Sequence, residues 1–173
     1  MIETDWIIIT GAPCSGKSKV LERLSFLGYN AYPEVSRILL DNLNSNGLNV
    51  EEYLVNKERF EKDILDLKLE LEERTRDEQL YFFDRGIIDS FAFMKFYDVQ
   101  IPNYENYLTY KYKKVFFLES VPYAHDEHRF ENQKQGEQIA NELKTLYSKY
   151  NYPLFNVPLM SIENRVELII KNI

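Results

Sequence analysis

A phosphate-binding pattern occupies residues 11–18. The run is a glycine, four residues and then Gly-Lys-Ser, namely Gly11, Ala12, Pro13, Cys14, Ser15, Gly16, Lys17 and Ser18. Backbone N–H groups in a loop of this spacing wrap the phosphates of a nucleotide, while the lysine reaches the β- and γ-phosphates and the hydroxyl ligates Mg²⁺. We therefore predict that residues 11–18, the phosphate loop, bind a nucleotide, with Lys17 catalytic and Ser18 a metal ligand. The alternative is a glycine-rich helix start with a surface lysine.

A second metal residue is expected at Asp84, which follows the apolar run Leu80-Tyr81-Phe82-Phe83. Proteins that transfer phosphoryl groups hold Mg²⁺ with an acid at the end of such a strand. A turn or helix-capping aspartate is the alternative. Arg85, beside it, is predicted to contact phosphate or substrate, with a surface ion pair as the competing interpretation.

Glu34 and Arg37 form a third candidate pair. Glu34 ends a short strand and precedes a helix start, so it could accept the proton of an attacking substrate hydroxyl. It could equally complement the positive end of that helix. Arg37 lies three residues on, one helical turn away, so the two side chains could hold one substrate.

The loop after Leu118 contains the last candidates. A mobile lid here would bring Arg129 to the transferring phosphoryl group, where an arginine neutralises developing charge. The alternative is a metal site made by His125, Asp126 and His128, although zinc sites usually have three or four protein ligands and no further Cys or His is available in this loop. Ordinary solvated loop residues remain a third interpretation of the two histidines.

Five short apolar runs are predicted as strands that place these residues. They lie at about residues 6–9, 29–32, 80–83, 114–118 and 154–158. Helical spacing of apolar residues predicts helices over about 16–27, for roughly 25 residues from Val50, over 139–150, and over 162–173 after Ser161 as N-cap. The charged residues of the long helix are expected on a solvated face, and residues 42–49 are expected to be a polar loop.

Alternation of strands and helices predicts an α/β fold with a mostly parallel five-stranded sheet covered by helices on both faces. Ligands in such folds bind beyond the carboxyl ends of the strands. Gly11, Glu34, Asp84 and Glu119 all fall at predicted strand ends. The length of 173 residues indicates one domain, 1–173.

Composition limits the partners. A net charge of -7 argues against a nucleic-acid partner, because a polyanion would be repelled. One cysteine excludes an internal disulfide and fits a reducing compartment. The N-terminal residues carry no basic region, and the apolar run there is too short for a signal or a membrane span, so a cytoplasmic protein is expected.

Five segments occur in the order found in one P-loop family: residues 9–18, residues 33–37, residues 83–86 with Asp89, residues 123–129, and Val157-Pro158 with Ser161 and Arg165. The chain resembles ribosylnicotinamide kinase domains, in a family that also includes a GTP- and phosphoinositide-binding protein of TRPL channel translocation. The resemblance implies a nucleoside-kinase-like fold, Mg²⁺ near Ser18 and Asp84, Arg129 on a lid, and adenine near Val157 and Pro158.

The chain departs from the family at two positions. Ala12 and Cys14 stand where glycines are frequent, and Cys14 places an oxidisable side chain beside the phosphates. The adenylyltransferase domain of bifunctional relatives has no room in this chain.

The expected function is a Mg²⁺-dependent kinase that moves the γ-phosphoryl group of ATP to a small hydroxyl-bearing acceptor such as a nucleoside. Glu34, Arg37 and Arg85 would line the acceptor pocket. No Asn-Lys-x-Asp motif is present to read guanine, which favours ATP. The alternative is a nucleotide-dependent switch or slow NTPase that acts through a partner.

Overall fold

The computed structural model describes residues 1–100, 103–120 and 133–173. Its central sheet has five strands, all paired in parallel, in the order β3-β4-β2-β6-β7. Their bounds are Trp6–Gly11 for β2, Asn30–Tyr32 for β3, Tyr81–Asp84 for β4, Lys114–Leu118 for β6 and Leu154–Val157 for β7. The predicted α/β fold is therefore confirmed, and each of these strands coincides with a predicted run.

Strand β2 is the centre of the sheet because it is apolar on both faces. It lies between β4 and β6, and all six of its residues are buried. Side chains alternate along a strand, so Ile7 and Ile9 point to one face while Trp6 and Ile8 point to the other. A strand covered on both faces needs this continuous apolar sequence.

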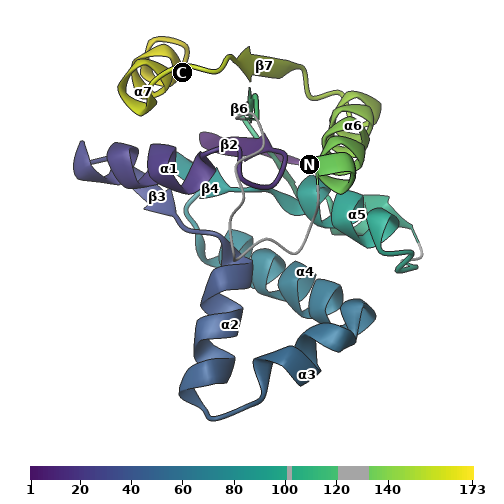
Figure 1. Ribbon diagram of the computed structural model, residues 1–173. Helices are drawn as coiled ribbons and strands as arrows, with labels where there is room; N and C mark the ends of the chain where they lie inside the picture. The colour runs from purple at the N-terminus through teal and green to yellow at the C-terminus, as the bar shows by residue number, and fades with distance from the viewer. Residues whose placement is uncertain (101–102, 121–132) are drawn as a thin grey trace.

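Helices cover both faces of the sheet (Figure 1). Helices α1 (Lys17–Phe26) and α7 (Ile162–Lys171) pack on the face of Ile7 and Ile9. Helices α4 (Lys57–Arg74), α5 (Ile87–Phe96) and α6 (Gln133–Lys149) pack on the opposite face. The phosphate loop follows β2 at the carboxyl edge, so both layers of helices border it.

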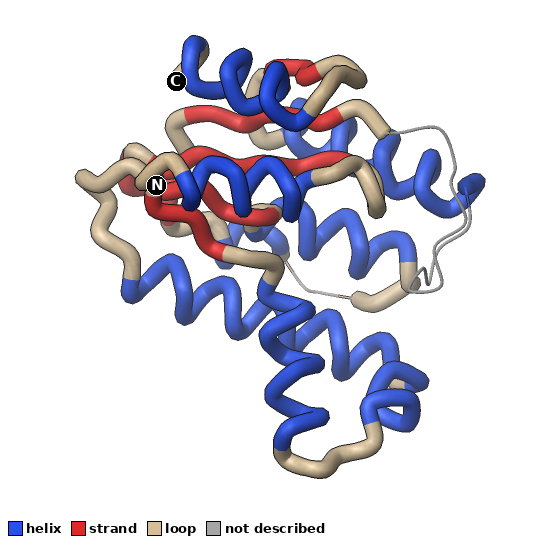
Figure 2. Tube along the Cα trace, turned by 60° about the vertical axis from the view of Figure 1, so that its left-hand side comes forward, coloured by secondary structure: helices blue, strands red, loops and turns tan. Residues whose placement is uncertain are grey.

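A helical arm extends from the sheet (Figures 1 and 2). It consists of α2 (Val35–Ser45), α3 (Val50–Val55) and α4, which contact one another. The single long helix predicted from Val50 is divided here, because the side chain of Asn56 accepts a hydrogen bond from Arg59 N and caps a new helix. Helix α2 continues to Ser45, so the loop predicted over 42–49 is shorter than expected.

Helix α4 buries charged residues. Glu61, Lys68 and Glu72 are between 3% and 6% exposed. They lie on the same stripe of the helix as Ile64 and Leu65, since steps of seven and eleven residues return to one face. The prediction that the charges of this segment form a solvated face was wrong for these three side chains.

Four elements were not predicted. Helix α5 is almost uniformly apolar, so it has no helical period to detect. The others are short: β1 (Ile2–Glu3), β5 (Tyr110–Lys111), which pairs with β1, and the 3-10 helix Tyr104–Tyr107.

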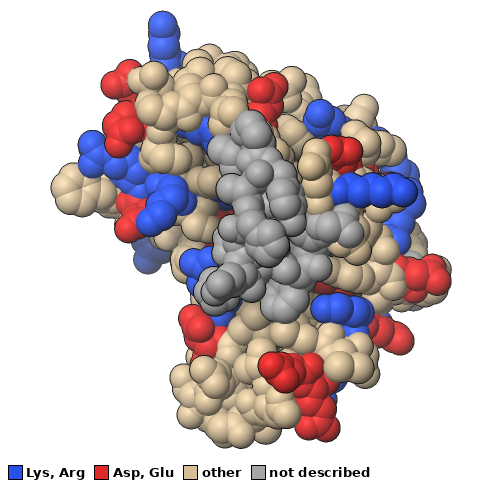
Figure 3. Space-filling view, in the orientation of Figure 1, with Lys and Arg blue, Asp and Glu red and all other residues tan. Residues whose placement is uncertain are grey.

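Basic and acidic side chains are interspersed on the face drawn in Figure 3, so neither sign of charge gathers in one patch there.

Within the described ranges, no helix has the length and apolar content needed to cross a membrane.

Candidate active site

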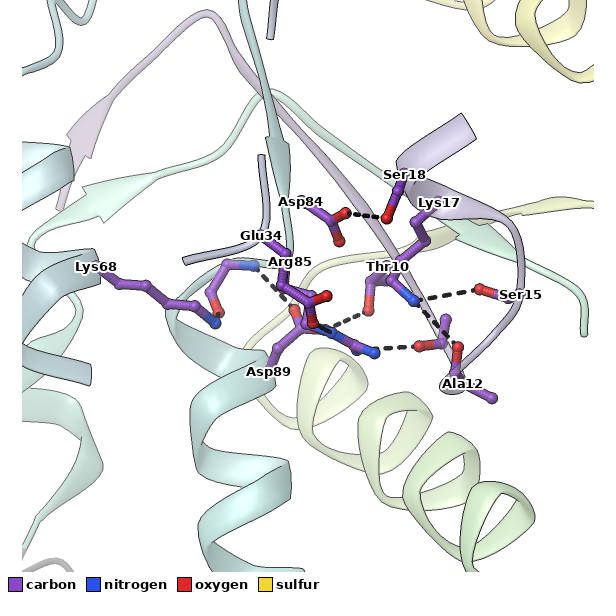
Figure 4. Close-up of polar contacts among 12 residues, drawn as sticks. Thr10, Ala12, Ser15, Lys17, Ser18, Glu34, Lys68, Asp84, Arg85 and Asp89 are labelled. Atoms are coloured by element: carbon purple, nitrogen blue, oxygen red, sulfur yellow. Dashed lines mark hydrogen bonds and ion pairs between the residues drawn. The ribbon is translucent and has the colours of Figure 1, made fainter. Parts of the chain in front are cut away.

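The phosphate loop joins β2 to α1 (Figure 4). Gly11 has a φ of 146°, and a Cβ atom there would lie 2.5 Å from the carbonyl oxygen of Leu118, so a side chain does not fit. Gly16 is the N-cap of α1 in a left-handed conformation that favours glycine. Because Gly16 has no side chain to cap the helix, the first N–H groups of α1 are available to an anion.

Lys17 begins α1, and its side chain returns into the phosphate loop. Its Nζ donates to Ala12 O at 3.1 Å and to Ser15 Oγ at 3.4 Å. Burial, assisted by the positive charge of Arg85, lowers the pKa of Lys17. A buried ammonium group bound only to neutral oxygens is well suited to a phosphate, because the anion would supply the missing counter-charge.

Ser18 and Asp84 face each other across the site. Asp84 is the last residue of β4 and pairs with Ile9 of β2, and Ser18 Oγ donates to its Oδ2 at 3.4 Å. The other carboxylate oxygen, Oδ1, is buried and has no hydrogen-bond partner among the described residues. Burial raises the pKa of Asp84 to about 6.

These two residues fit a magnesium ion. Mg²⁺ binds through oxygen ligands and takes only one or two from the protein, the rest coming from phosphates and water. The buried Oδ1 of Asp84, which lacks a partner, is such a ligand, and the hydroxyl of Ser18 is a second. No group of three His, Cys, Asp or Glu side chains among residues 1–100, 103–120 and 133–173 could hold a metal by itself.

Glu34, Arg85 and Asp89 form a chain of ion pairs (Figure 4). Arg85 Nε donates to Glu34 Oε1 at 3.2 Å, and Arg85 NH1 donates to Asp89 Oδ1 at 3.2 Å and to Gly11 O at 3.0 Å. Arg85 is 7% exposed, so the surface ion pair considered from the sequence is instead a buried one. The backbone of Arg85 is left-handed, with a φ of 69°.

Glu34 precedes α2 and makes no capping hydrogen bond with that helix. Burial opposes its ionisation, but the charges of Arg85 and Lys17 outweigh burial and lower its pKa below the usual value. The carboxylate is therefore ionised at neutral pH and held in one orientation by Arg85.

Asp89 holds this chain in place from α5. It accepts hydrogen bonds from Thr10 Oγ1 at 2.5 Å, from Tyr147 OH at 2.5 Å and from Gly86 N at 3.0 Å, in addition to Arg85. Asp89 belongs to one of the family motifs in the sequence, but no role was predicted for it. Its position on the first turn of a largely apolar helix, five residues after Asp84, was the available signal.

Lys68 of α4 was also missed. Its ammonium group is buried and donates to Gly86 O at 3.0 Å, and burial lowers its pKa. The turn Asp84-Arg85-Gly86 is thus held from α4 by Lys68 and from α5 by Asp89. Charged residues on a predicted amphipathic helix are normally assigned to solvent, which is why the sequence did not identify it.

A cavity of about 480 Å³ lies next to these groups. Its lining includes Ser18, Glu34, Arg37 and Asp84, which come from α1, the start of α2 and the end of β4. Arg37 is exposed and makes no hydrogen bond or ion pair with the described part of the chain. The structure therefore brings the predicted metal pair and two of the predicted substrate residues to one cavity, while Arg85 lies behind Glu34.

The remaining predicted residues divide into two groups. Val157 ends β7 and Pro158 follows it, at the same edge of the sheet as the phosphate loop, and Glu119 N donates to Val157 O at 3.0 Å. Tyr123, His125, Asp126, His128 and Arg129 lie outside the described residues, so the lid arginine and the alternative metal site both stay predictions.

Comparisons with known proteins give a family and a fold. A family model described as an AAA domain matches residues 6–165. No curated protein matched the sequence.

Solved structures match nearly the whole chain. A deoxyadenosine kinase from M. mycoides, with dCMP and dCDP as products, has a TM-score of 0.65 and 18% identity, over 96% of this chain and 97% of that one. A thymidylate kinase from Candida albicans has a TM-score of 0.67 and 16% identity, over 96% and 89%. The NadR protein in complex with NR has a TM-score of 0.72 and 11% identity, over 97% of this chain and 51% of NadR. The chain has the fold of P-loop nucleoside and nucleotide kinases.

Proposed function

The chain belongs to the AAA-domain family, and from this premise and the geometry of its site we propose that it is a Mg²⁺-dependent small-molecule kinase. The donor is ATP, and the acceptor is a hydroxyl-bearing metabolite, with nucleosides as the leading class. One observation carries the proposal: the cavity that holds Ser18 and Asp84 also contains an ionised glutamate from a different strand end. A phosphate site alone would not need Glu34.

Each group has a distinct role. Lys17 and the N–H groups of the phosphate loop bind the β- and γ-phosphates of ATP. Ser18 and Asp84 hold Mg²⁺, which neutralises phosphate charge when bound. Positioning and electrostatic stabilisation dominate phosphoryl transfer, so the principal task of the acceptor side is to orient the hydroxyl.

Glu34 performs that orientation. Its carboxylate accepts a hydrogen bond from the acceptor hydroxyl and takes the proton as the new O–P bond forms and the bond from the γ-phosphorus to the bridging oxygen of the leaving ADP breaks. Because its pKa is lowered, Glu34 is a weak base, and the proton moves late in the reaction, when the hydroxyl has become acidic. Arg85 keeps the carboxylate at the cavity wall, and Arg37 lies at the margin where it can contact the rest of the acceptor.

Two conservative substitutions test the proposal. Glu34→Gln keeps the size of the side chain but removes the proton acceptor, so transfer to the acceptor should fall by about a hundredfold while ATP affinity stays within about twofold. Asp84→Asn removes the metal carboxylate and should slow both transfer and the background hydrolysis of ATP. Asp41→Asn, on an exposed position of α2, is the control and should change neither rate.

The measurement is consumption of ATP with Mg²⁺ against a panel of nucleosides and other hydroxylated metabolites, ribosylnicotinamide included. Transfer that survives Glu34→Gln would remove the role of Glu34. Absence of any acceptor, together with a partner protein that binds only the nucleotide-loaded form, would replace the kinase by a switch.

A further inference from the structure

Arg165 is a buried cation at the nucleotide side of the site. It lies on α7 and is 1% exposed. Its guanidinium group donates to three carbonyl oxygens: NH1 to Ser15 at 2.6 Å, NH2 to Glu119 at 2.8 Å and Nε to Pro158 at 3.2 Å. All three of its nitrogen atoms are thus used, and each bonds a different segment of the chain.

The charge of Arg165 is not bonded to any carboxylate of the described residues, and the negative charge of Glu119 acts on it only through space. All of its hydrogen bonds go to backbone carbonyl oxygens, and it forms no ion pair within the described residues. It also lies one turn from the N-terminal end of α7, where the helix dipole disfavours a cation. Burying a cation without a counter-ion is costly even when its N–H groups are satisfied, so a purely structural role would be met more cheaply by a neutral side chain.

The three acceptors all lie at the edge where the predicted nucleotide site is. Ser15 belongs to the phosphate loop, Glu119 directly follows β6, and Pro158 directly follows β7. Helix α7 packs beside α1, the helix that the phosphate loop opens (Figure 1). One guanidinium group therefore joins the phosphate loop to the residues that directly follow β6 and β7.

The bond to Ser15 acts directly on a phosphate-binding group. In a planar trans peptide the C=O and N–H bonds point in opposite directions, so fixing Ser15 O also fixes the N–H of Gly16. A cation bound to the carbonyl polarises the peptide and makes that N–H a stronger donor. The contact is close, since a Cβ atom added to Gly16 would lie 3.3 Å from NH1 of Arg165.

We propose that Arg165 is a positioning residue of the nucleotide site, which fixes the Ser15–Gly16 peptide for phosphate binding and whose charge is compensated when the triphosphate binds. It touches neither acceptor nor reacting atoms, so it sets nucleotide affinity and leaves the transfer step unchanged. This inference rests on the nucleotide binding of the proposed function and does not depend on which acceptor is used.

Two variants separate the contributions of charge and geometry. Arg165→Lys keeps the charge but loses the fork that reaches three carbonyls, and Arg165→Met keeps the length but loses both. We expect the Kd for Mg·ATP to rise by about tenfold in the Lys variant and about a hundredfold in the Met variant, since both lose charge-assisted hydrogen bonds. At saturating ATP, kcat should stay within about threefold.

Two controls on the same helix address indirect effects. Lys171→Met removes an exposed cation in the last turn of α7 and should leave the Kd unchanged. Ile169→Val destabilises the buried side of α7 without contact with the nucleotide edge, and should lower the Tm but not the affinity. Binding is measured by calorimetry on folded protein, with the Tm of each variant determined in parallel.

Unchanged affinity in both Arg165 variants would overturn the proposal, whatever their stability, and so would a loss of affinity that Ile169→Val reproduces. If the Met variant does not fold, the Lys variant decides. The binding measurement contains no acceptor, so failure to find an acceptor contradicts the kinase proposal but leaves the measured change in Kd valid.

Discussion

The two faces of the central sheet bury different kinds of side chain. The face covered by α1 and α7 packs an apolar cluster, with the charged side chains of Asp84 and Arg165 at its carboxyl edge. The face covered by α4, α5 and α6 packs an apolar cluster that also encloses charged and hydroxyl groups. The polar members of the second face are Lys68, Glu72, Asp89, Tyr112 and Tyr147.

The difference corresponds to two ways of building a site. The hydrogen bonds of Lys17 reach two and five residues along the chain, so the position of its ammonium group is set locally, even though Arg165 and Arg85 also bond the phosphate loop from 150 and 74 residues away. Asp89 binds Thr10 and Tyr147, which are 79 and 58 residues away, so the proposed acceptor side forms only after the sheet and its helices have assembled. A network of satisfied polar groups in a low-dielectric interior is rigid, which suits groups that must orient a hydroxyl.

The largest effect is expected from Lys17→Ala. Removing the cation that acts on the phosphates should lower kcat/KM for ATP by about a thousandfold. It should also abolish the rise in Tm that ATP produces, because a ligand stabilises only the state it binds. Lys62→Ala, which removes an exposed cation of α4, should preserve both. If ATP raised the Tm of Lys17→Ala as much as that of the wild type, the phosphate-binding role of Lys17 would be wrong.

Asp89→Asn should have the next largest effect, on folding. The amide places a donor where Asp89 now accepts hydrogen bonds from four donors, and it leaves the charge of Arg85 incompletely paired. Breaking a buried pair in this way costs about 3 kcal/mol or more. Urea unfolding measures the loss, and Glu70→Gln, in an exposed pair with Arg74, should cost no more than about 0.5 kcal/mol.

Equal losses in the two variants would mean that the buried network contributes little more than a surface ion pair.

The sequence predicts the features that adjacent residues encode and misses those that depend on contacts between distant elements. Strand β2 and the phosphate loop are encoded by adjacent residues, so a β-branched run and a fixed spacing were enough to locate them. Helix α5 was not predicted, because a helix that is apolar on nearly every side shows no helical period of apolar residues in its sequence. Lys68 and Glu72 were assigned to solvent because nothing local distinguishes a buried charge from an exposed one; the distinguishing partners are Gly86 O and Tyr112 OH, from other elements.

The third prediction concerns Glu72, on the polar face, and the pH dependence of the free energy of unfolding. Burial raises the pKa of Glu72 to about 7, although the hydrogen bond from Tyr112 OH at 2.6 Å favours the ionised form. Between its unfolded value near 4.5 and about 7, the folded protein holds the proton more tightly than the unfolded chain. Stability from this group is therefore complete at low pH and is lost as pH rises through that window, by up to about 3 kcal/mol.

Glu72→Gln tests this assignment, because glutamine keeps the acceptor for Tyr112 but cannot ionise. The difference in unfolding free energy between variant and wild type should grow in favour of the variant from pH 5 to pH 8. Comparing the two proteins cancels the contribution of Asp84, whose pKa is also raised and which is common to both. The free energy of unfolding is measured with urea at each pH. If the difference between Glu72→Gln and wild type stayed constant from pH 5 to pH 8, the pKa of Glu72 would not be raised by burial.

The smallest effect is expected from Ile7→Val, on the apolar face. Ile7 is fully buried among side chains of α1, α7 and the neighbouring strands, and losing one methylene from such a site costs about 1 kcal/mol. The residues of that cluster are apolar, and Asp84, which titrates at the edge of this face, is common to variant and wild type, so the cost should be the same at every pH, in contrast to Glu72→Gln. Nucleotide affinity should also remain unchanged, because β2 meets the phosphate loop only at Gly11, four residues further on.

Urea unfolding at pH 5 and pH 8, with calorimetric titration of Mg·ATP, measures both quantities. If the cost of Ile7→Val varied with pH as strongly as that of Glu72→Gln, the two faces would share one electrostatic network, and the separation between an apolar nucleotide face and a polar acceptor face would have to be abandoned.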